Sequence, residues 1–226
     1  MLKSIWLVLY FITLLADLIF VGFDMGAIRF TSKPLLMVLL ALYFMSNTGH
    51  VRAIYRYLLL AALAFSFGGD VLLMFDGRGM TFFIAGLGSF LLAHMMYILF
   101  FLKIRYTNDP RPDCHYFAAF ITEAIVIAFI FFMLPYLGDM TIPVIIYAIG
   151  ISFTLLCALH AFRLQQQTAG WYCILGAILF IISDSLIAVG KFYQPIPLGG
   201  VLVMLTYGLA QAGLVYGSTR YLNSRV

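Results

Sequence analysis

The chain has 226 residues, of which 64% are hydrophobic and only 10% are charged. A soluble domain has about 25% charged residues, so this composition excludes a soluble globular protein and indicates an integral membrane protein. The 13 basic residues outnumber the 9 acidic ones, but no run of Lys and Arg is long enough to indicate nucleic-acid binding. The three cysteines show neither CxxC metal-site spacing nor a disulfide framework.

Eight apolar runs are candidates for membrane spans, since an α-helix needs about 20 residues to cross a bilayer. Their continuous apolarity favours helices over the short alternating strands of a membrane barrel. We therefore predict an all-α polytopic membrane protein with eight transmembrane helices, in which residues 1–226 form a single integral membrane domain. The second span is the weakest, because only residues 34–45 are purely apolar. The predicted spans are residues 4–23, 33–48, 56–75, 82–102, 115–134, 142–161, 171–189 and 198–218.

Basic residues in the predicted loops indicate the orientation. Nine lie on the side of both termini and four lie on the opposite side, and loops rich in Lys and Arg stay in the cytoplasm. We expect both termini in the cytoplasm, and short loops without long tails favour a bacterial inner membrane. The nine are Lys3, Arg52, Arg56, Lys103, Arg105, Arg111, Arg163, Arg220 and Arg225, and the four are Arg29, Lys33, Arg78 and Lys191.

Two similar stretches each place one aspartate near the outer end of a predicted span. Asp70 follows Gly69 in the third span, and Asp184 follows Ser183 in the seventh, 114 residues later. This spacing is close to half the chain length and is compatible with a parallel repeat of four spans plus four, residues 1–113 and 114–226. A carboxylate in hydrocarbon costs about 2.5–3.5 kcal/mol and marks a functional site by default. We expect the two aspartates to share one site, with structural ion pairs as the alternative.

Other polar residues lie in or beside the same layer of the membrane. Asp17 near the end of the first span and Lys33 at the start of the second are expected at the depth of the two aspartates. For Asp17 we expect a structural role. His94 lies near the middle of the fourth span, where it is either an interhelical hydrogen-bond partner or a catalytic group.

Three more residues complete the predicted polar set. Tyr97 shares a helix face with His94, and Tyr207 and Gln211 lie four residues apart on one face of the eighth span. Tyr207 and Gln211 either position a ligand or join helices. Ser183 stands beside Asp184, but no histidine is close in sequence to activate it, and GxSxG, HExxH and P-loop motifs are absent from the sequence. We therefore expect carboxylate chemistry without metal or cofactor, in which one carboxyl is protonated and the other ionised.

Four short motifs follow one another along the predicted spans. They are Lys33-Pro34-Leu35, Gly69-Asp70-Val71-Leu72, Gly88-x-Phe90-x-x-x-His94-x-x-Tyr97 and Ser183-Asp184-Ser185-Leu186, followed by Tyr207 and Gln211. In content, order and spacing they resemble the YhhN family of integral membrane lysoplasmalogenases. The first span and residues 103–116 carry no matching motif.

The resemblance implies hydrolysis of the vinyl ether bond of a lysoplasmalogen, a lysophospholipid of the bilayer, to a fatty aldehyde and a glycerophospho-alcohol. Asp70 and Asp184 would be the catalytic carboxyls: one protonates the vinyl ether, and the other stabilises the resulting cation and orients water. Lys33 would contact the headgroup phosphate or orient one of the acids. His94 and Tyr97 would position substrate or water.

Two other classes of protein fit the same acids. A proton-coupled transporter of a small molecule or lipid would use paired intramembrane acids, with discontinuous helices near Pro34 and Pro143. A non-catalytic lipid-binding protein would use the aspartates only to hold helices together, and would keep its function after both were replaced by asparagine.

Overall fold

The computed structural model describes residues 2–108 and 113–224, and all of its long elements are helices. No strand occurs in the part of the chain that it describes, so the predicted all-α class is confirmed. Three short helical segments are η1 (Asp76–Arg78), η2 (Gly138–Met140) and the π-helix η3 (Val189–Tyr193). The long helices are α1 (Leu2–Gly22), α2 (Gly26–Asn47), α3 (Ala53–Leu73), α4 (Met80–Thr107), α5 (Tyr116–Leu137), α6 (Thr141–Ala161), α7 (Ala169–Ala188) and α8 (Gly199–Asn223).

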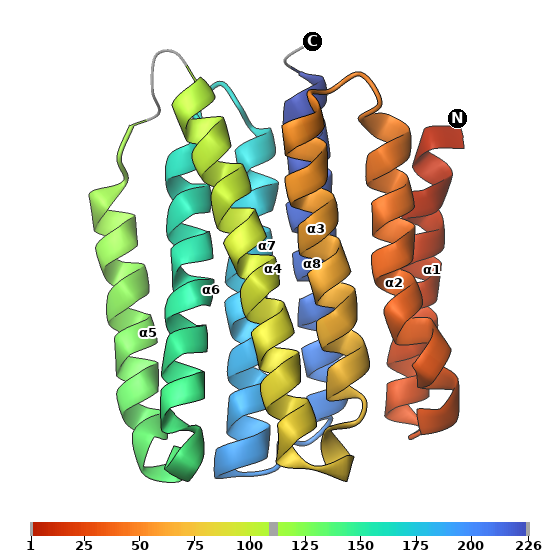
Figure 1. Ribbon diagram of the computed structural model, residues 1–226, viewed down its shortest axis with the longest axis vertical. Coiled ribbons are helices and arrows are strands. Elements are labelled where there is room, and N and C mark those ends of the chain that lie inside the picture. The colour runs from red at the N-terminus through yellow and green to blue at the C-terminus, as the bar shows by residue number, and fades with distance from the viewer. Residues whose placement is uncertain (1, 109–112, 225–226) are drawn as a thin grey trace.

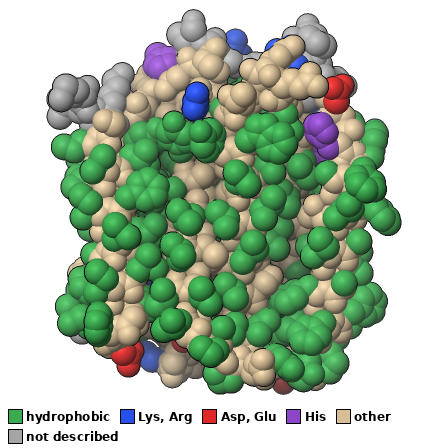
Figure 2. Space-filling view, turned by 180° about the vertical axis from the view of Figure 1, so that it is seen from behind, with side chains coloured by type: hydrophobic (Ala, Val, Ile, Leu, Met, Phe, Trp, Pro, Cys, Tyr) green, Lys and Arg blue, Asp and Glu red, His purple; other side chains and the backbone are tan. Residues whose placement is uncertain are grey.

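Seven helical stretches among the described residues are long and apolar enough to cross a membrane. One of them, Tyr116–Ala161, contains α5, η2 and α6. It reverses direction at Gly138, whose φ of 51° belongs to the left-handed region that glycine adopts easily, and α5 and α6 pack side by side (Figure 1). Hydrophobic side chains cover the flank of the bundle, and charged side chains gather toward its two ends (Figure 2). These features are those of an integral membrane protein.

The helices pack mainly as hairpins of consecutive elements. α1 packs on α2, α3 on α4, α5 on α6 and α7 on α8, and further contacts join α4 to α6 and α2 to α8. Both ends of the chain lie at the same end of the bundle (Figure 1). Of the basic residues that the orientation prediction used, Arg111 and Arg225 lie outside the described residues.

Small residues allow the closest helix contacts. A β-carbon on Gly213 of α8 would lie 2.9 Å from the backbone oxygen of Tyr172 on α7, so these two backbones approach each other as small-residue interfaces permit. A β-carbon on Gly69 of α3 would lie 2.5 Å from the Phe90 ring on α4. Gly69 therefore makes room for an aromatic ring directly beside Asp70.

α2 runs unbroken from Gly26 to Asn47 with Pro34 inside it. It begins seven residues before the predicted start of the second span. Pro143 lies in the first turn of α6, a position that tolerates proline. The discontinuous helices that a transporter would need at these two prolines are therefore not found in α2 or α6.

Candidate functional site

Asp70 lies in a buried polar cluster between α2, α3, α4 and α8. Its side chain is fully buried, and the Lys33 ammonium lies 3.2 Å from Oδ1. The Tyr207 hydroxyl donates a 2.7 Å hydrogen bond to Oδ2. Both carboxyl oxygens of Asp70 thus face a partner, one of them a cation that is only 12% exposed. The Asp70 cluster consists of Lys33, Ser66, Asp70, Tyr97, Tyr207 and Gln211.

Gln211 connects the rest of the Asp70 cluster. Its amide oxygen accepts a 2.8 Å hydrogen bond from the Tyr97 hydroxyl, and its Nε2 donates a 3.0 Å hydrogen bond to Ser66 Oγ. All three residues are fully buried. Buried polar groups are costly unless they are hydrogen-bonded, and this network pairs groups from α3, α4 and α8.

Asp184 belongs to a second polar cluster, made by α4, α6 and α7. The Tyr147 hydroxyl donates a hydrogen bond to Asp184 Oδ2 and lies 3.4 Å from His94 Nε2. The other ring nitrogen, His94 Nδ1, lies 3.1 Å from Thr154 Oγ1. No cation lies within 4 Å of Asp184 among the described residues. The Asp184 cluster consists of His94, Tyr147, Thr154 and Asp184.

An aromatic pair, Phe90 and Phe180, separates the two clusters. The Phe180 ring lies 4.6 Å from the His94 ring on one side and 5.5 Å from the Tyr207 ring on the other, centroid to centroid. The Phe90 ring lies 6.1 Å from Phe180 and 5.8 Å from Tyr207. Most of the predicted residues are thus gathered in one region of the bundle, but the two aspartates have different partners and do not touch.

The Asp184 cluster opens on an apolar groove of about 350 Å³ between α5, α6 and α7. Isoleucines from all three helices line it, and Asp184 is the only carboxyl among the described residues of its lining. Asp184 Oδ1 accepts no hydrogen bond from a described residue, and it is not one of the fully buried side-chain atoms that lack a partner, so it is partly accessible. A second cavity of about 40 Å³ touches Asp184 and Tyr147 on the side of Phe90, which is room for a water molecule.

Two predicted residues lie apart from these clusters. Asp17 is buried at the junction of α1 and α2, where Ser32 Oγ donates a 2.5 Å hydrogen bond to it and Arg29 Nε lies at 3.7 Å. Ser183 donates a 3.2 Å hydrogen bond to the backbone oxygen of Val203 and so links α7 to α8 rather than contacting Asp184.

Tyr147 and Thr154 are part of the site but were not predicted from the sequence. They lie seven residues apart on α6, and seven residues are two helical turns, so both face the same side. This polar pair on one face of an apolar helix is a sequence signal. Its meaning depends on which helices pack against that face.

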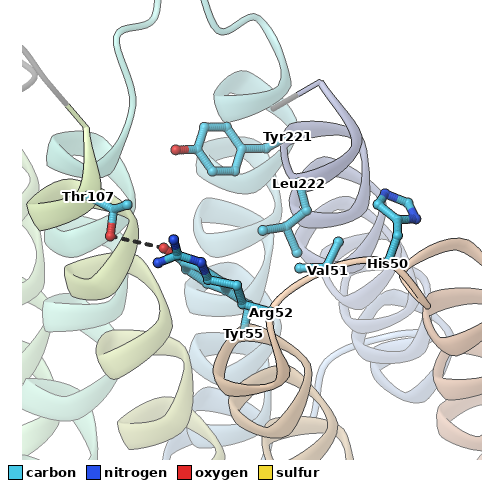
Figure 3. A pocket seen from close by; sticks show the side chains of 7 residues that line it. All are labelled: His50, Val51, Arg52, Tyr55, Thr107, Tyr221 and Leu222. Atoms are coloured by element: carbon cyan, nitrogen blue, oxygen red, sulfur yellow. Dashed lines mark hydrogen bonds between the residues drawn. The ribbon is translucent and has the colours of Figure 1, made fainter. Parts of the chain in front are cut away.

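The cavity in Figure 3 has a different character. It measures about 270 Å³ and lies at the end of the bundle that holds both termini. Tyr55 on α3 donates a 2.9 Å hydrogen bond to Thr107 Oγ1 inside it, and none of the described residues that line it is acidic. The described residues that line this cavity are His50, Val51, Arg52, Tyr55, Thr107, Tyr221 and Leu222.

Comparison with known proteins identifies the chain's relatives. The model of the YhhN family matches residues 28–218, which include both clusters and the groove. The chain belongs to the YhhN family. Asp17 and the whole of α1 lie outside the matched region.

Members of this family with curated names share about 30% of their residues with the chain. A lysoplasmalogenase of Mycobacterium tuberculosis is 31% identical over 169 residues, which is 72% of this chain and 62% of that protein. Human lysoplasmalogenase TMEM86B is 28% identical over 195 residues, 83% of this chain and 73% of the human protein. The chain thus spans less than two thirds of the mycobacterial relative, and no solved structure matches it.

Proposed function

We propose that this protein hydrolyses the vinyl ether bond of lysoplasmalogens and releases a fatty aldehyde and a glycerophospho-alcohol. The names of its relatives support this activity. One structural observation carries the proposal: the Asp184 carboxyl lines an apolar groove between α5, α6 and α7, and no cation of the described residues lies within 4 Å of it. A protonated carboxyl in such a place can donate its proton to a substrate whose hydrocarbon chain lies in the groove.

The groove suits the alkenyl chain of a lysolipid. Ligand pockets are typically about 300–1,000 Å³ and mostly apolar, with few polar groups, and this groove of about 350 Å³ meets both conditions. Asp184 lies four residues before the end of α7, which is about 6 Å along the helix axis. The vinyl ether of a lysoplasmalogen joins the chain to its glycerol and lies just below the headgroup. We place the headgroup toward η3 and the chain deeper, toward Ile151 and Ile181.

In the reaction, Asp184 must donate one proton to the substrate and later accept one from water. Protonated Asp184 gives its proton to the β-carbon of the vinyl ether, which forms an oxocarbenium ion. A water molecule, for which the cavity beside Phe90 has room, adds to this cation, and the Asp184 carboxylate takes the proton that the water loses. The resulting hemiacetal breaks its bond to the glycerol oxygen, and the hydroxyl proton passes to that oxygen. One water is consumed, and Asp184 ends protonated as it began.

Asp70 has a different role in this proposal. The Lys33 ammonium, 3.2 Å away, keeps Asp70 ionised. Asp70 therefore serves as a fixed negative charge on the far side of the aromatic pair, and this charge stabilises the oxocarbenium ion electrostatically. Lys33 orients this acid, which is one of the two roles expected for it. Tyr207, Gln211 and Tyr97 hold the cluster in place, and Ser183 and Asp17 support the surrounding helices.

The membrane topology belongs to the same proposal. We place α5 and α6 as separate spans, so that the chain crosses the membrane eight times, with both termini in the cytoplasm of a bacterium. The packing supports a parallel 4+4 repeat: the pairs α3–α4 and α2–α8 have counterparts in α7–α8 and α6–α4. Asp184 then lies toward the non-cytoplasmic face, and the substrate is a lipid of that leaflet.

Aldehyde release from a lysoplasmenylethanolamine by the purified protein in detergent tests the proposal. Asp184→Asn and Asp70→Asn are compared with Asp139→Asn, which changes an exposed aspartate at the same end of the bundle. We expect Asp184→Asn to lower kcat by at least about 1,000-fold, since it removes the general acid. Asp70→Asn lowers kcat less, and Asp139→Asn leaves it unchanged.

Three outcomes would contradict the proposal. A folded wild-type protein that releases no aldehyde from any lysoplasmalogen would exclude the activity. Full activity of Asp184→Asn would exclude Asp184 as the acid. Specific lipid binding that survives both asparagine substitutions, without hydrolysis, would indicate a non-catalytic lipid-binding protein.

A further inference from the structure

A chain of hydrogen-bonding groups leads from Asp184 into the interior of the bundle. It runs from Asp184 to Tyr147, then to His94 and Thr154, and ends at the backbone oxygen of Gly150, which lies 3.1 Å from Thr154 Oγ1. His94 is fully buried and Thr154 is 1% exposed. Of the two ends of this hydrogen-bonded series, the Asp184 carboxyl is the one that lines a cavity large enough for a substrate.

The number of available protons limits how the hydrogen bonds in this series can be directed. The Tyr147 hydroxyl has one proton and two neighbours, Asp184 Oδ2 and His94 Nε2. If Tyr147 donates to Asp184, then His94 donates Nε2–H to Tyr147 and Thr154 donates to His94 Nδ1. If Asp184 instead carries its proton on Oδ2 and donates to Tyr147, every bond reverses, and Thr154 donates to Gly150.

The two arrangements differ in which carboxyl oxygen carries the proton. In the first, Oδ2 is an acceptor, so a proton on Asp184 must sit on Oδ1, which has no partner in the described chain. In the second, the proton points at Tyr147 and away from the groove. Only the first arrangement can protonate a substrate in the groove.

We propose that Tyr147 is a positioning residue that donates to Oδ2 of Asp184 and thereby directs the acidic proton of Oδ1 into the groove. His94 and Thr154 act through it, because they fix the direction in which its hydroxyl points. This inference rests on the proposed function for its catalytic consequence, whereas the hydrogen bond itself can be tested without turnover.

Kinetics of three variants test the catalytic part. Tyr147→Phe keeps the ring in the groove and removes the donor, so we expect kcat to fall about 10- to 100-fold, as for one lost hydrogen bond to a charged group, while KM changes by less than about 2-fold. Thr154→Val lowers kcat less. In the Tyr147→Phe background it causes no further loss, because groups that act through one another are not additive.

Tyr55→Phe is the matched control. It also removes a buried tyrosine hydrogen bond, the one to Thr107 shown in Figure 3, but far from Asp184. We expect unchanged kcat and KM. If Tyr147→Phe retained wild-type kcat, or if Thr154→Val lowered kcat equally in both backgrounds, the positioning role would be wrong. A wild-type protein that releases no aldehyde would instead contradict the proposed function.

Infrared spectroscopy tests the hydrogen bond independently of activity. The carbonyl stretch of protonated Asp184, assigned by its loss in Asp184→Asn, should move to higher wavenumber in Tyr147→Phe because the carbonyl oxygen Oδ2 loses its donor. Tyr55→Phe should leave the band in place. An Asp184 band that stays unchanged in Tyr147→Phe would overturn the proposal even if no substrate were turned over.

Discussion

The ion pair between Lys33 and Asp70 gives the sharpest test of how the buried charges act. Its two side chains are 12% and 1% exposed, and their charged atoms are 3.2 Å apart. At an effective dielectric constant of about 20, two unit charges at this distance attract by about 5 kcal/mol. Removing one partner of a buried pair typically costs about 3–5 kcal/mol, because the remaining charge is left uncompensated. We expect Lys33→Met to destabilise the fold by an amount in this range.

A double variant separates the charge from the packing. Lys33→Met with Asp70→Asn removes both charges, and the asparagine can still accept the hydrogen bond of Tyr207, so most of the lost stability should return. Unfolding by a rising fraction of sodium dodecyl sulfate in mixed micelles measures all three variants against wild type. A cost below about 1 kcal/mol for Lys33→Met, or a double variant no more stable than Lys33→Met, would refute this reasoning.

The same double variant also tests the role of Asp70 in turnover. It is expected to be folded and to lack the fixed negative charge of Asp70. If that charge stabilises the oxocarbenium ion, the double variant releases aldehyde much more slowly than wild type although its stability is restored. If Asp70 only holds helices together, activity returns together with stability.

Three further substitutions, two of them with a matched control, test the packing and the groove. Gly69→Ala places a methyl group against the phenylalanine ring packed on it, and should lower the free energy of unfolding by about 1–3 kcal/mol and reduce activity. Gly88 has open space around its α-carbon, so Gly88→Ala should be neutral or slightly stabilising. Ile125→Trp narrows the groove and should raise KM for long alkenyl chains by about 10-fold, which corresponds to the lost burial of about two methylene groups. Ile127 is exposed outside the groove, so Ile127→Trp should leave KM unchanged. Equal KM values for the two variants would show that the alkenyl chain of the substrate binds elsewhere. Ser183→Ala should cost about 0.5–1.5 kcal/mol of stability and leave kcat unchanged, and a large fall in kcat with unaltered stability would contradict its packing role.

The membrane class and the long helices follow from the sequence because burial in lipid requires continuous apolar runs. The start of α2 could not be predicted in this way. Arg29 and Ser32 interrupt the apolar run, so hydropathy places the helix start after them, at Lys33. In the folded chain these polar side chains have partners on α1 and α3: Arg29 and Ser32 contact Asp17, and Lys33 pairs with Asp70. Once paired, they are compatible with a helix that begins at Gly26.

The site was predictable in part for a similar reason. A charged side chain in an apolar span is rare, so Asp70 and Asp184 are conspicuous in the sequence. Tyr147 is not, because tyrosine is common in this chain, with 14 copies, and is ordinary in a membrane span. Its importance comes from facing Asp184 on α7 and His94 on α4 at once. Contacts between three helices that are distant in sequence cannot be deduced from the pattern within any one of them.

The spacing of the two halves accounts for the difference between the two aspartates. The offset of 114 residues that relates Asp70 to Asp184 also relates Lys33 to Tyr147, and each of these residues contacts the aspartate of its own half. In the proposed repeat, a lysine in the first half therefore corresponds to a tyrosine in the second. In the proposed mechanism the cation holds one carboxyl as an anion, whereas the neutral donor leaves the other able to carry a proton, and such divergent surroundings suit acid chemistry by a pair of carboxyls. Tyr97 and Gln211 are also 114 residues apart, and they are hydrogen-bonded to each other, as expected for equivalent residues beside the twofold axis of the proposed repeat.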